Sequence, residues 1–362
     1  MGRTPQEPLR ADRIAAFLQR RGYANARIIR LQPLGESGVS SKSYGYGKPL
    51  RILFEAADGR HELVLRTMSP DRFGHERLGD RFETFVLARE DFPRIPRHIQ
   101  PVAMGVVDGD GSLHPLAVGE PFLLTEYVDG TLYAGDVQNL ADGDTLTDLD
   151  RERARALAAY LAGLHSRVED AEYYCRHVRD VTGSGEGIFG LCESYLRCED
   201  SPLTPSDLEW IEQRAVHWRW RLLQRPDRAR RGHGDFHPFN LLFRSGTDFT
   251  VLDCSRGGRG DPADDMCCLT INYLFFGLMR SPHFNGPCRE LWNLVWQDYL
   301  DATGDVDMLG LVAPYFAWRG LVLASPIWYP HVDEAVRESL LSFIRALLEG
   351  APFDPRTVET LL

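Results

Sequence analysis

Three polar side chains in one short segment constrain this chain more than any other feature of its sequence. The stretch from His233 to Asn240, His-Gly-Asp-Phe-His-Pro-Phe-Asn, places Asp235 five residues before Asn240, and Asp253 follows thirteen residues after Asn240. Two short apolar runs on either side of a Ser-Gly-Thr turn predict a β-hairpin between Asn240 and Asp253. That hairpin would bring Asp253 back beside Asn240. Carboxylate and amide oxygens are ligands that Mg²⁺ takes in small number together with phosphate oxygens, so the segment predicts a magnesium site.

A simpler interpretation is that His-Gly-Asp forms an ordinary polar turn and that Asp253 is an ordinary acid at the end of a strand. The tripeptide alone does not decide between the two. The coincidence of two acids, one amide and this spacing favours the site.

The interval from Asp235 to Asn240 is the D-x-x-x-x-N spacing of the protein-kinase catalytic loop. The chain resembles the aminoglycoside phosphotransferase and choline kinase-like family of small-molecule kinases. Its signature runs H-G-D-x-H-x-x-N, then I-D-(F/W), then G-D-P-x-x-D. Here the three parts read His233 to Asn240, Leu252-Asp253-Cys254 and Gly260-Asp-Pro-Ala-Asp-Asp265. The resemblance covers about residues 28 to 275 and is strongest in the catalytic segment.

This resemblance implies a reaction in which the terminal phosphoryl group of ATP or GTP moves to a hydroxyl of a small molecule, such as an aminoglycoside, a related antibiotic or a metabolite. Asp235 would deprotonate the acceptor hydroxyl, while Asn240 and Asp253 hold Mg²⁺ on the nucleotide phosphates. Other residues of the signature would brace the catalytic loop, with substrate binding as the alternative for the last of them. These braces are His233, Asp261 and Asp265.

A glycine- and serine-rich segment from Leu34 to Tyr44 is the candidate phosphate loop. Its glycines permit close backbone approach, and its serines offer N–H and hydroxyl donors. The expected nucleotide-binding residues of this loop are Gly35, Ser37, Gly38, Ser40 and Lys42. It lacks the glycines of a Walker A motif. Taken alone it could be a surface turn, but its place one hairpin before Leu63-Val-Leu-Arg66 favours phosphate binding.

Arg66 occupies the strand position at which related kinases place a phosphate-binding lysine. Arginine keeps the positive charge and can form two hydrogen bonds to phosphate oxygens at once, but it is not equivalent to lysine. We expect its carboxylate partner to be Glu83, with Glu76 as the alternative, and the nucleotide base to meet backbone groups near Glu126 and Val128.

Lysine is rare among the basic residues of this chain. Only two of the 41 basic residues are lysines, with Lys42 inside the glycine-rich segment and Lys48 just after it. Either this is codon drift, or Lys42 supplies a mobile charge to the phosphates.

The expected fold class is α+β, a bilobal protein-kinase-like fold. Residues 1–127 would form the nucleotide-binding lobe, with an N-terminal helix and a five-stranded antiparallel sheet accompanied by one helix. Strand-like runs at 27–34, 51–55, 62–66, 102–107 and 122–127, with a helix over 78–89, support this division. Residues 128–362 would form a larger, mostly helical lobe that carries the catalytic loop and the acceptor site.

Composition narrows the class of protein. A net charge of -11 argues against a nucleic-acid partner, because phosphate-binding surfaces need excess Lys and Arg. The charge is weakly compatible with a cationic substrate. Seven cysteines without C-x-x-C spacing indicate reduced thiols and a cytoplasmic location. The two most apolar stretches, 266–279 and 308–328, are too short or too interrupted to span a membrane.

Two other classes of function remain open from the sequence. One is a nucleotide-binding pseudokinase, a sensor module that keeps the pocket without turnover. The other is a metal-dependent phosphohydrolase, although no further ligand cluster with two-metal spacing is present.

Overall fold

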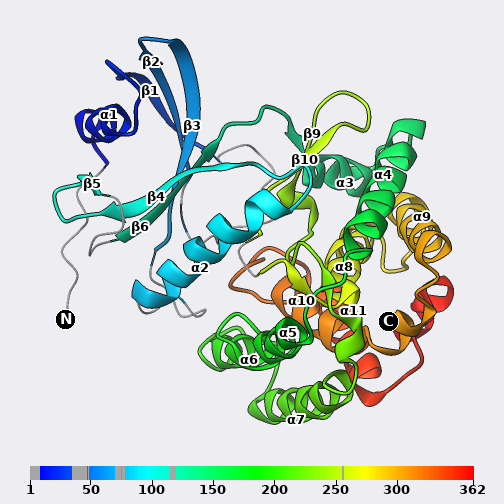
Figure 1. Ribbon diagram of the computed structural model, residues 1–362. Coiled ribbons are helices and arrows are strands. Elements are labelled where there is room, and N and C mark those ends of the chain that lie inside the picture. The colour runs from blue at the N-terminus through cyan, green and yellow to red at the C-terminus, as the bar shows by residue number, and fades with distance from the viewer. Residues whose placement is uncertain are drawn as a thin grey trace.

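The computed structural model divides the protein into a β-sheet part and a larger helical part (Figure 1). It describes residues 9–34, 47, 49–69, 75, 78–114, 120–254 and 257–362. This architecture confirms the expected α+β, kinase-like fold class.

The sheet part is a single antiparallel sheet with strand order β1-β2-β3-β6-β4-β5. Its strands are β1 (Arg27–Pro33), β2 (Leu50–Ala56), β3 (Gly59–Thr67), β4 (Pro101–Val107), β5 (Leu113–His114) and β6 (Glu120–Glu126). The expectation of five strands was wrong by one, because β5 is only two residues long. A strand that short carries no alternation of apolar and polar residues by which it could be recognised.

Helix α1 (Ala11–Arg20) packs on the sheet through one apolar face. Ile14, Phe17 and Leu18 are spaced three and four residues apart, and all three are buried. The ring of Phe17 meets the ring of Phe122 edge to face at 5.2 Å between centroids. This small core is separate from the main one.

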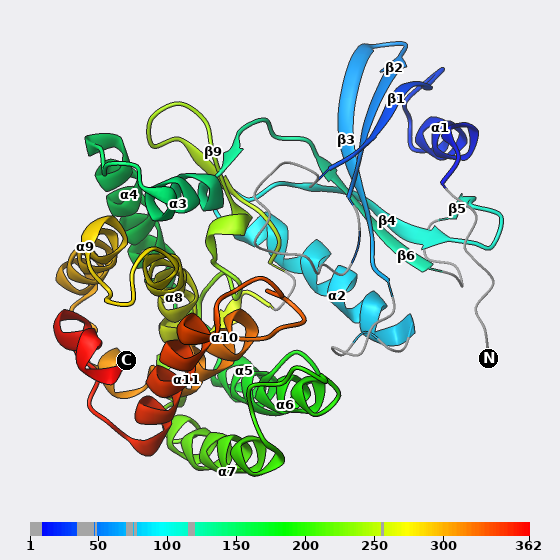
Figure 2. The same ribbon diagram turned by 180° about the vertical axis from the view of Figure 1, so that it is seen from behind.

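Helix α2 (Leu78–Asp91) lies between the sheet and the helical part (Figures 1 and 2). Phe85 and Ala88 are buried in the same apolar cluster as residues of the helical part, including Tyr174 and Phe236. The helix therefore belongs to the main core and ties the sheet to the second lobe.

The helical part follows a short extended segment, in which Gly130 has a φ of 154° and approaches the Phe243 carbonyl so closely that a Cβ would lie 2.7 Å from it. Helix α8 is buried over almost its whole length and forms the centre of this part. The α-helices are α3 (Tyr133–Asp142), α4 (Asp148–His165), α5 (Ala171–Gly183), α6 (Ile188–Leu196), α7 (Pro205–Leu222), α8 (Pro262–Arg280), α9 (Gly286–Thr303), α10 (Ala313–Leu323) and α11 (Glu334–Glu349). The 3₁₀ helices are η1 (Phe92–Arg94), η2 (Pro226–Arg228), η3 (Pro238–Asn240), η4 (Val306–Gly310) and η5 (Pro355–Leu361).

The expected catalytic hairpin is present. Strands β9 (Leu241–Phe243) and β10 (Phe249–Val251) pair antiparallel, and β7 (Thr131–Leu132) adds a third strand beside β9. Beyond the last pair, the Leu252 N–H donates to the Asn240 carbonyl at 2.8 Å. The hairpin therefore returns the chain to Asn240 immediately before Asp253. A two-stranded pair, β8 (Arg230–Arg231) with β11 (Arg259–Gly260), frames the same region.

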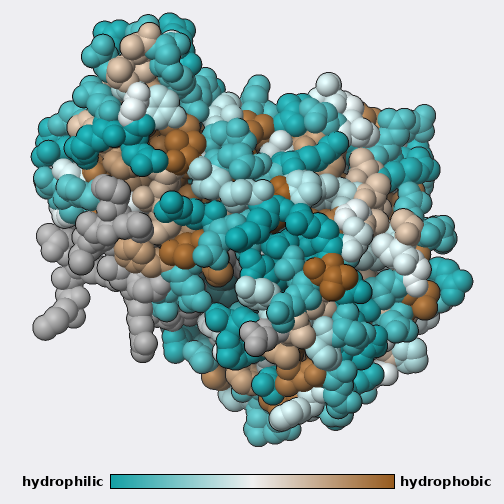
Figure 3. Space-filling model, viewed as in Figure 1, coloured by the Kyte–Doolittle hydropathy of each residue, from teal (hydrophilic) through white to brown (hydrophobic). Residues whose placement is uncertain are grey.

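The face of the molecule seen in Figure 3 is largely hydrophilic, with apolar side chains scattered among polar ones. Among the helices that the structure describes, none has the length and apolar character needed to cross a bilayer.

Candidate functional site

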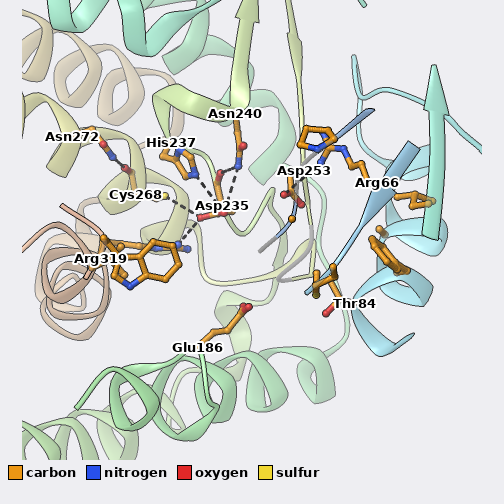
Figure 4. A pocket seen from close by; sticks show the side chains of 18 of the residues that line it. Arg66, Thr84, Glu186, Asp235, His237, Asn240, Asp253, Cys268, Asn272 and Arg319 are labelled. Atoms are coloured by element: carbon orange, nitrogen blue, oxygen red, sulfur yellow. Dashed lines mark hydrogen bonds and ion pairs between the residues drawn. The ribbon is translucent and has the colours of Figure 1, made fainter. Parts of the chain in front are cut away.

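A cavity of about 280 Å³ lies where the end of β3, helix α2, the catalytic hairpin and helices α8 and α10 meet. Figure 4 shows Asp235 near its centre, with Asp253 and Arg66 on one side and Cys268, Asn272 and Arg319 on the other. The structure thus brings the three residues of the sequence motif, Asp235, Asn240 and Asp253, to one cavity.

Asp235 is held by contacts to both of its carboxylate oxygens. Its Oδ1 accepts a hydrogen bond of 2.7 Å from Nη1 of Arg319. Its Oδ2 lies 3.5 Å from Nδ2 of Asn240 and 3.6 Å from Nε2 of His237. The side chain is only 11% exposed, so its orientation is fixed by these neighbours.

Asn240 lies at the end of η3 and faces Asp235. Its Nδ2 donates to the Asp235 carbonyl at 3.0 Å, which leaves the amide oxygen as the atom that can take a metal ion or another donor. His237 caps the same turn, because its Nδ1 accepts from the Phe239 N–H at 3.2 Å.

Asp253 has an unusual backbone. Its φ of 46° lies in the left-handed region, which costs a non-glycine residue about 1–2 kcal/mol. A strained residue at the rim of a cavity is a reason to suspect function. Asp253 and Asn240 together offer hard oxygen donors that suit Mg²⁺. Among the described residues there is no cluster of three or more His, Cys, Asp or Glu that could hold a metal, so phosphate oxygens would have to complete the coordination.

Arg66 lies at the end of β3 and faces Asp253. Its Nη1 is 3.6 Å from Oδ2 of Asp253. Within the described part of the chain, its buried Nε has no hydrogen-bond partner. The cation is therefore placed beside the candidate metal ligand, with donor capacity left for another group.

The expected pairing of Arg66 with Glu83 is wrong. Glu83 Oε1 pairs instead with Nη2 of Arg176, on α5, at 3.0 Å, and both side chains are about half exposed. Along α2, the residues that line the cavity are Thr84, Phe85 and Ala88, so Glu83 lies on a different face of the helix. Glu76, the alternative partner, lies outside the described residues.

The contacts expected between the nucleotide base and backbone groups near Glu126 and Val128 stay a prediction. The Glu126 N–H already donates to the Gln100 carbonyl at 3.2 Å, and neither Glu126 nor Val128 lines the cavity. Residue Leu123 of β6 lines it instead.

Residues Gly35, Ser37, Gly38, Ser40 and Lys42 lie outside the described part of the chain. Gly47, just beyond that loop, packs so closely on β3 that an added Cβ would clash with the Thr67 carbonyl oxygen.

Asp265 is buried beneath the catalytic loop. Its two oxygens accept from the backbone N–H groups of His233, at 2.7 Å, and Gly234, at 2.8 Å. Nε2 of His165 lies 3.1 Å from Oδ2. Burial alone would raise the pKa of Asp265, but these hydrogen bonds and the nearby histidines hold it below its usual value. The charged form is therefore the one that the fold favours.

His233 itself is fully buried. Its Nδ1 accepts from the Asp235 N–H at 3.3 Å, which closes a tight turn within the loop. The side chain contributes no atom to the lining of the cavity.

Asp261 has contacts other than those expected of it. It caps the start of α8 by accepting from the Ala263 N–H at 3.0 Å, and it takes two hydrogen bonds of 2.8 Å from Arg228. Tyr174 donates to it as well. Within the described residues, its polar contacts hold α8 and α5 together rather than the catalytic loop.

Sequence reasoning missed Arg319 and its partner Asp264. Arg319 is buried in α10, and its Nη2 donates to both the Gly234 carbonyl and Oδ1 of Asp264 at 2.7 Å. Burial raises the pKa of Asp264, and Arg319 offsets this only in part. Asp264 stood within the signature, but Arg319 lies some 80 residues beyond the loop in a helix with no motif of its own.

Comparison with solved structures supports the fold. An amicoumacin kinase solved with AMP-PNP, Ca²⁺ and Ami aligns at a TM-score of 0.56 with 17% identity over 91% of each chain. An ethanolamine kinase from Plasmodium vivax aligns at 0.48 with 11% identity over 91% of this chain and 80% of that one. A macrolide 2'-phosphotransferase from Brachybacterium faecium aligns at 0.45 with 16% identity over 92% and 97%. No curated protein sequence matches the chain significantly.

A family model supplies the stronger comparison. The model of the phosphotransferase enzyme family matches residues 49–283, well over half of the chain. The match runs from β2 through the catalytic hairpin and the whole of α8. It therefore includes Arg66, Asp235, Asn240 and Asp253, and the chain belongs to the phosphotransferase enzyme family.

Proposed function

We propose that this protein transfers the terminal phosphoryl group of ATP or GTP to a hydroxyl of a small molecule. The observation that carries the proposal is the meeting of Asp235, Asn240 and Asp253 in one cavity, with Arg66 facing Asp253. The acceptor classes that the sequence resemblance implies range from aminoglycosides and other antibiotics to metabolites. The proposed chemistry is the same for all of them.

Asp235 is the proposed general base. The acceptor oxygen forms a bond to the terminal phosphorus, the bond from that phosphorus to the nucleoside diphosphate breaks, and the hydroxyl proton passes to the Asp235 carboxylate. The products are a phosphate monoester, a nucleoside diphosphate and a proton that Asp235 later releases. A positioned base of this kind contributes about 10²–10⁴-fold to the rate.

Arg319 is proposed to hold that base in place. Its hydrogen bond to Oδ1 fixes the carboxylate, so that Oδ2 is the oxygen presented toward Asn240 and His237. The same guanidinium also holds the loop backbone at Gly234, so base and loop move as one unit. Misplacing a reacting group by about 1 Å can cost about 10²-fold in rate.

Asn240 and Asp253 are the proposed ligands of Mg²⁺. The donor set fits the ion, since both present hard oxygens and the Asn240 amide nitrogen is engaged elsewhere. When bound, the metal would neutralise charge on the transferring phosphates.

The phosphates are the proposed partners of Arg66. The unused donor capacity of its Nε and the absence of a carboxylate closer than 3.6 Å among the described residues support this assignment. The glycine-rich loop, with Gly35, Ser37, Gly38, Ser40 and Lys42, is proposed to cover the phosphates. Asp265 and His233 are proposed to brace the catalytic loop through its backbone.

The division into lobes at residues 1–127 and 128–362 is part of the same proposal, as is a cytoplasmic location. Seven free cysteines, four of them buried in the main core, suit a reducing compartment.

The test is release of ADP or GDP against a panel of hydroxyl acceptors in the presence of Mg²⁺. The proposal expects acceptor-dependent release that Asp235→Asn abolishes without loss of nucleotide binding. Nucleotide binding without turnover on any acceptor, and with no difference between wild type and Asp235→Asn, would favour a pseudokinase instead.

A further inference from the structure

The cavity extends past Asp235 in the direction away from Arg66 and Asp253 (Figure 4). Phosphoryl transfer places the attacking and leaving oxygens roughly in line across the phosphorus. If the phosphates lie near Arg66 and Asp253, as proposed above, the acceptor must approach Asp235 from the opposite side. The end of the cavity formed by α8, α10 and the segment after α10 is then the acceptor end.

The walls of this acceptor end are mostly apolar. Trp328 and Tyr329 are only 3% and 4% exposed, and they come from the segment after α10. Ile271, Val322 and Leu323 complete the apolar surface. This surface suits an apolar or aromatic body rather than a heavily hydrated one.

Few polar atoms remain at this end to recognise a ligand. Asn272 donates its Nδ2 to the Cys268 carbonyl at 2.8 Å, which leaves its amide oxygen to accept one hydrogen bond from a ligand. Burial and the nearby Asp235 carboxylate raise the pKa of the Tyr329 phenol, so this group stays neutral.

Each described carboxylate on the cavity already faces a cationic or protonatable group. Asp235 is 2.7 Å from Arg319, and Asp253 is 3.6 Å from Arg66. Glu186, the remaining acid, is 2.6 Å from Nε2 of the buried His75.

The apolar walls work against a polycation. An ammonium group that moves from water to an apolar surface loses its hydration, and this is unfavourable unless a carboxylate receives the charge. An acceptor with an ammonium group beside its reacting hydroxyl would meet this penalty.

We propose that the acceptor is a hydroxyl compound whose cavity-bound part is uncharged and largely apolar. The inference rests on the proposed phosphotransferase function and narrows its substrate class.

The test compares two sets of probes in the same ADP-release assay with ATP and Mg²⁺. One set holds the polycations kanamycin and streptomycin, and the other holds uncharged alcohols with aromatic bodies, such as 2-phenylethanol and 2-naphthylethanol. The uncharged alcohols should raise ADP release and change the fluorescence emission of Trp328. That emission is measured as the difference between the fluorescence of the wild-type protein and that of Trp328→Phe. The polycations should do neither.

Val322→Asp places an uncompensated carboxylate on the apolar wall and should weaken the response to the uncharged alcohols by about tenfold or more. Val322→Thr keeps the shape of the side chain and should weaken the response to the uncharged alcohols by about threefold. This variant provides the test if Val322→Asp does not fold. Val306→Asp, the same change at a residue that is 64% exposed, is the matched control and should have no effect.

Saturable ADP release with kanamycin, or the lack of any response to the uncharged alcohols in both rate and emission, would overturn the inference. Failure of the proposed function would look different. In that case, neither set of probes would raise ADP release, while the uncharged alcohols would still change the emission of Trp328.

Discussion

Nη1 of Arg66, at the end of β3, lies 3.6 Å from Oδ2 of Asp253, at the end of the catalytic hairpin. One cation from the sheet part thus lies beside one acid from the helical part on the same side of the cavity (Figure 4). In the proposed reaction, a nucleotide with its metal would engage both groups, with the metal on Asp253 and the phosphates on Arg66.

This relationship predicts that nucleotide affinity depends on Mg²⁺ through Asp253. Asp253→Asn withdraws the anionic ligand of the proposed site and should remove most of the gain in ATP affinity that Mg²⁺ provides. Titration calorimetry with and without Mg²⁺ measures that gain, at about 1.4 kcal/mol for each factor of ten.

Asp248→Asn is the matched control for this change. Asp248 lies in the same hairpin, is largely exposed and pairs with Arg244, so its loss should leave the effect of Mg²⁺ intact. Equal ATP affinity of the wild-type protein with and without Mg²⁺ would contradict the assignment.

The ion pair between Glu83 and Arg176 leads to a second prediction. Its pair with Arg176 is about half exposed, and such pairs contribute about 0–1 kcal/mol to the free energy of unfolding. Glu83→Gln should therefore change the KM for ATP by less than about twofold, while Arg66→Ala raises it clearly. A rise in KM for Glu83→Gln as large as that for Arg66→Ala would restore Glu83 as the partner of Arg66.

Arg319 should affect turnover more than nucleotide binding. Arg319→Met removes the donor that fixes Asp235, so kcat should fall by about 10²-fold with little change in the Kd for ATP. The acid limb of the kcat profile should also move to higher pH, because loss of a neighbouring positive charge disfavours the ionised carboxylate.

Arg319→Lys keeps the positive charge but cannot form all of the hydrogen bonds that the guanidinium group makes to Asp235, Gly234 and Asp264. It should restore the position of the acid limb while recovering kcat only in part. If the Met and Lys variants share one pH profile, Arg319 has only a structural role.

The buried His98 should account for part of the loss of folding stability at acid pH. Burial and the neighbouring His233 lower the pKa of His98 from 6.5 to about 3. Between these two values the unfolded chain binds a proton that the folded protein does not, so stability falls as the pH falls through this window. The slope is about 1.4 kcal/mol per pH unit for one such group.

His98→Asn removes this titration and should flatten the decline of the unfolding free energy between about pH 6.5 and pH 3, measured by urea denaturation. The exposed His283 provides the control, since His283→Asn should leave the slope unchanged. An unchanged slope in His98→Asn would mean that His98 is not buried in its neutral form.

The sequence predicted those parts of the molecule that depend on local spacing. The interval between Asp235 and Asn240 and the turn before Asp253 set the catalytic hairpin, because register in a short hairpin follows from its turn. The apolar face of α1 and the positions of the main strands along the chain follow from periodicity in the same way.

The sequence did not predict contacts made between distant elements. Arg319 reaches Asp235 only because α10 packs against α8, and no local pattern records that packing. Helix α2 follows β3 in the sequence, which makes Glu83 the expected partner of Arg66, but the rotation of α2 about its axis turns Thr84 to the cavity and Glu83 to Arg176. That rotation depends on how Phe85 and Ala88 pack in the main core.

The central claim is that Asp235 is the base of a phosphoryl transfer, and Asp235→Asn tests it most directly. The variant is nearly isosteric and can keep the hydrogen bond from Arg319, so the fold and the ATP site should survive. On an acceptor that the wild-type protein phosphorylates, the account predicts a kcat lower by about 10²–10⁴-fold with a Kd for ATP within about twofold of wild type. Near-normal turnover by Asp235→Asn on that acceptor would contradict the account and place the base elsewhere.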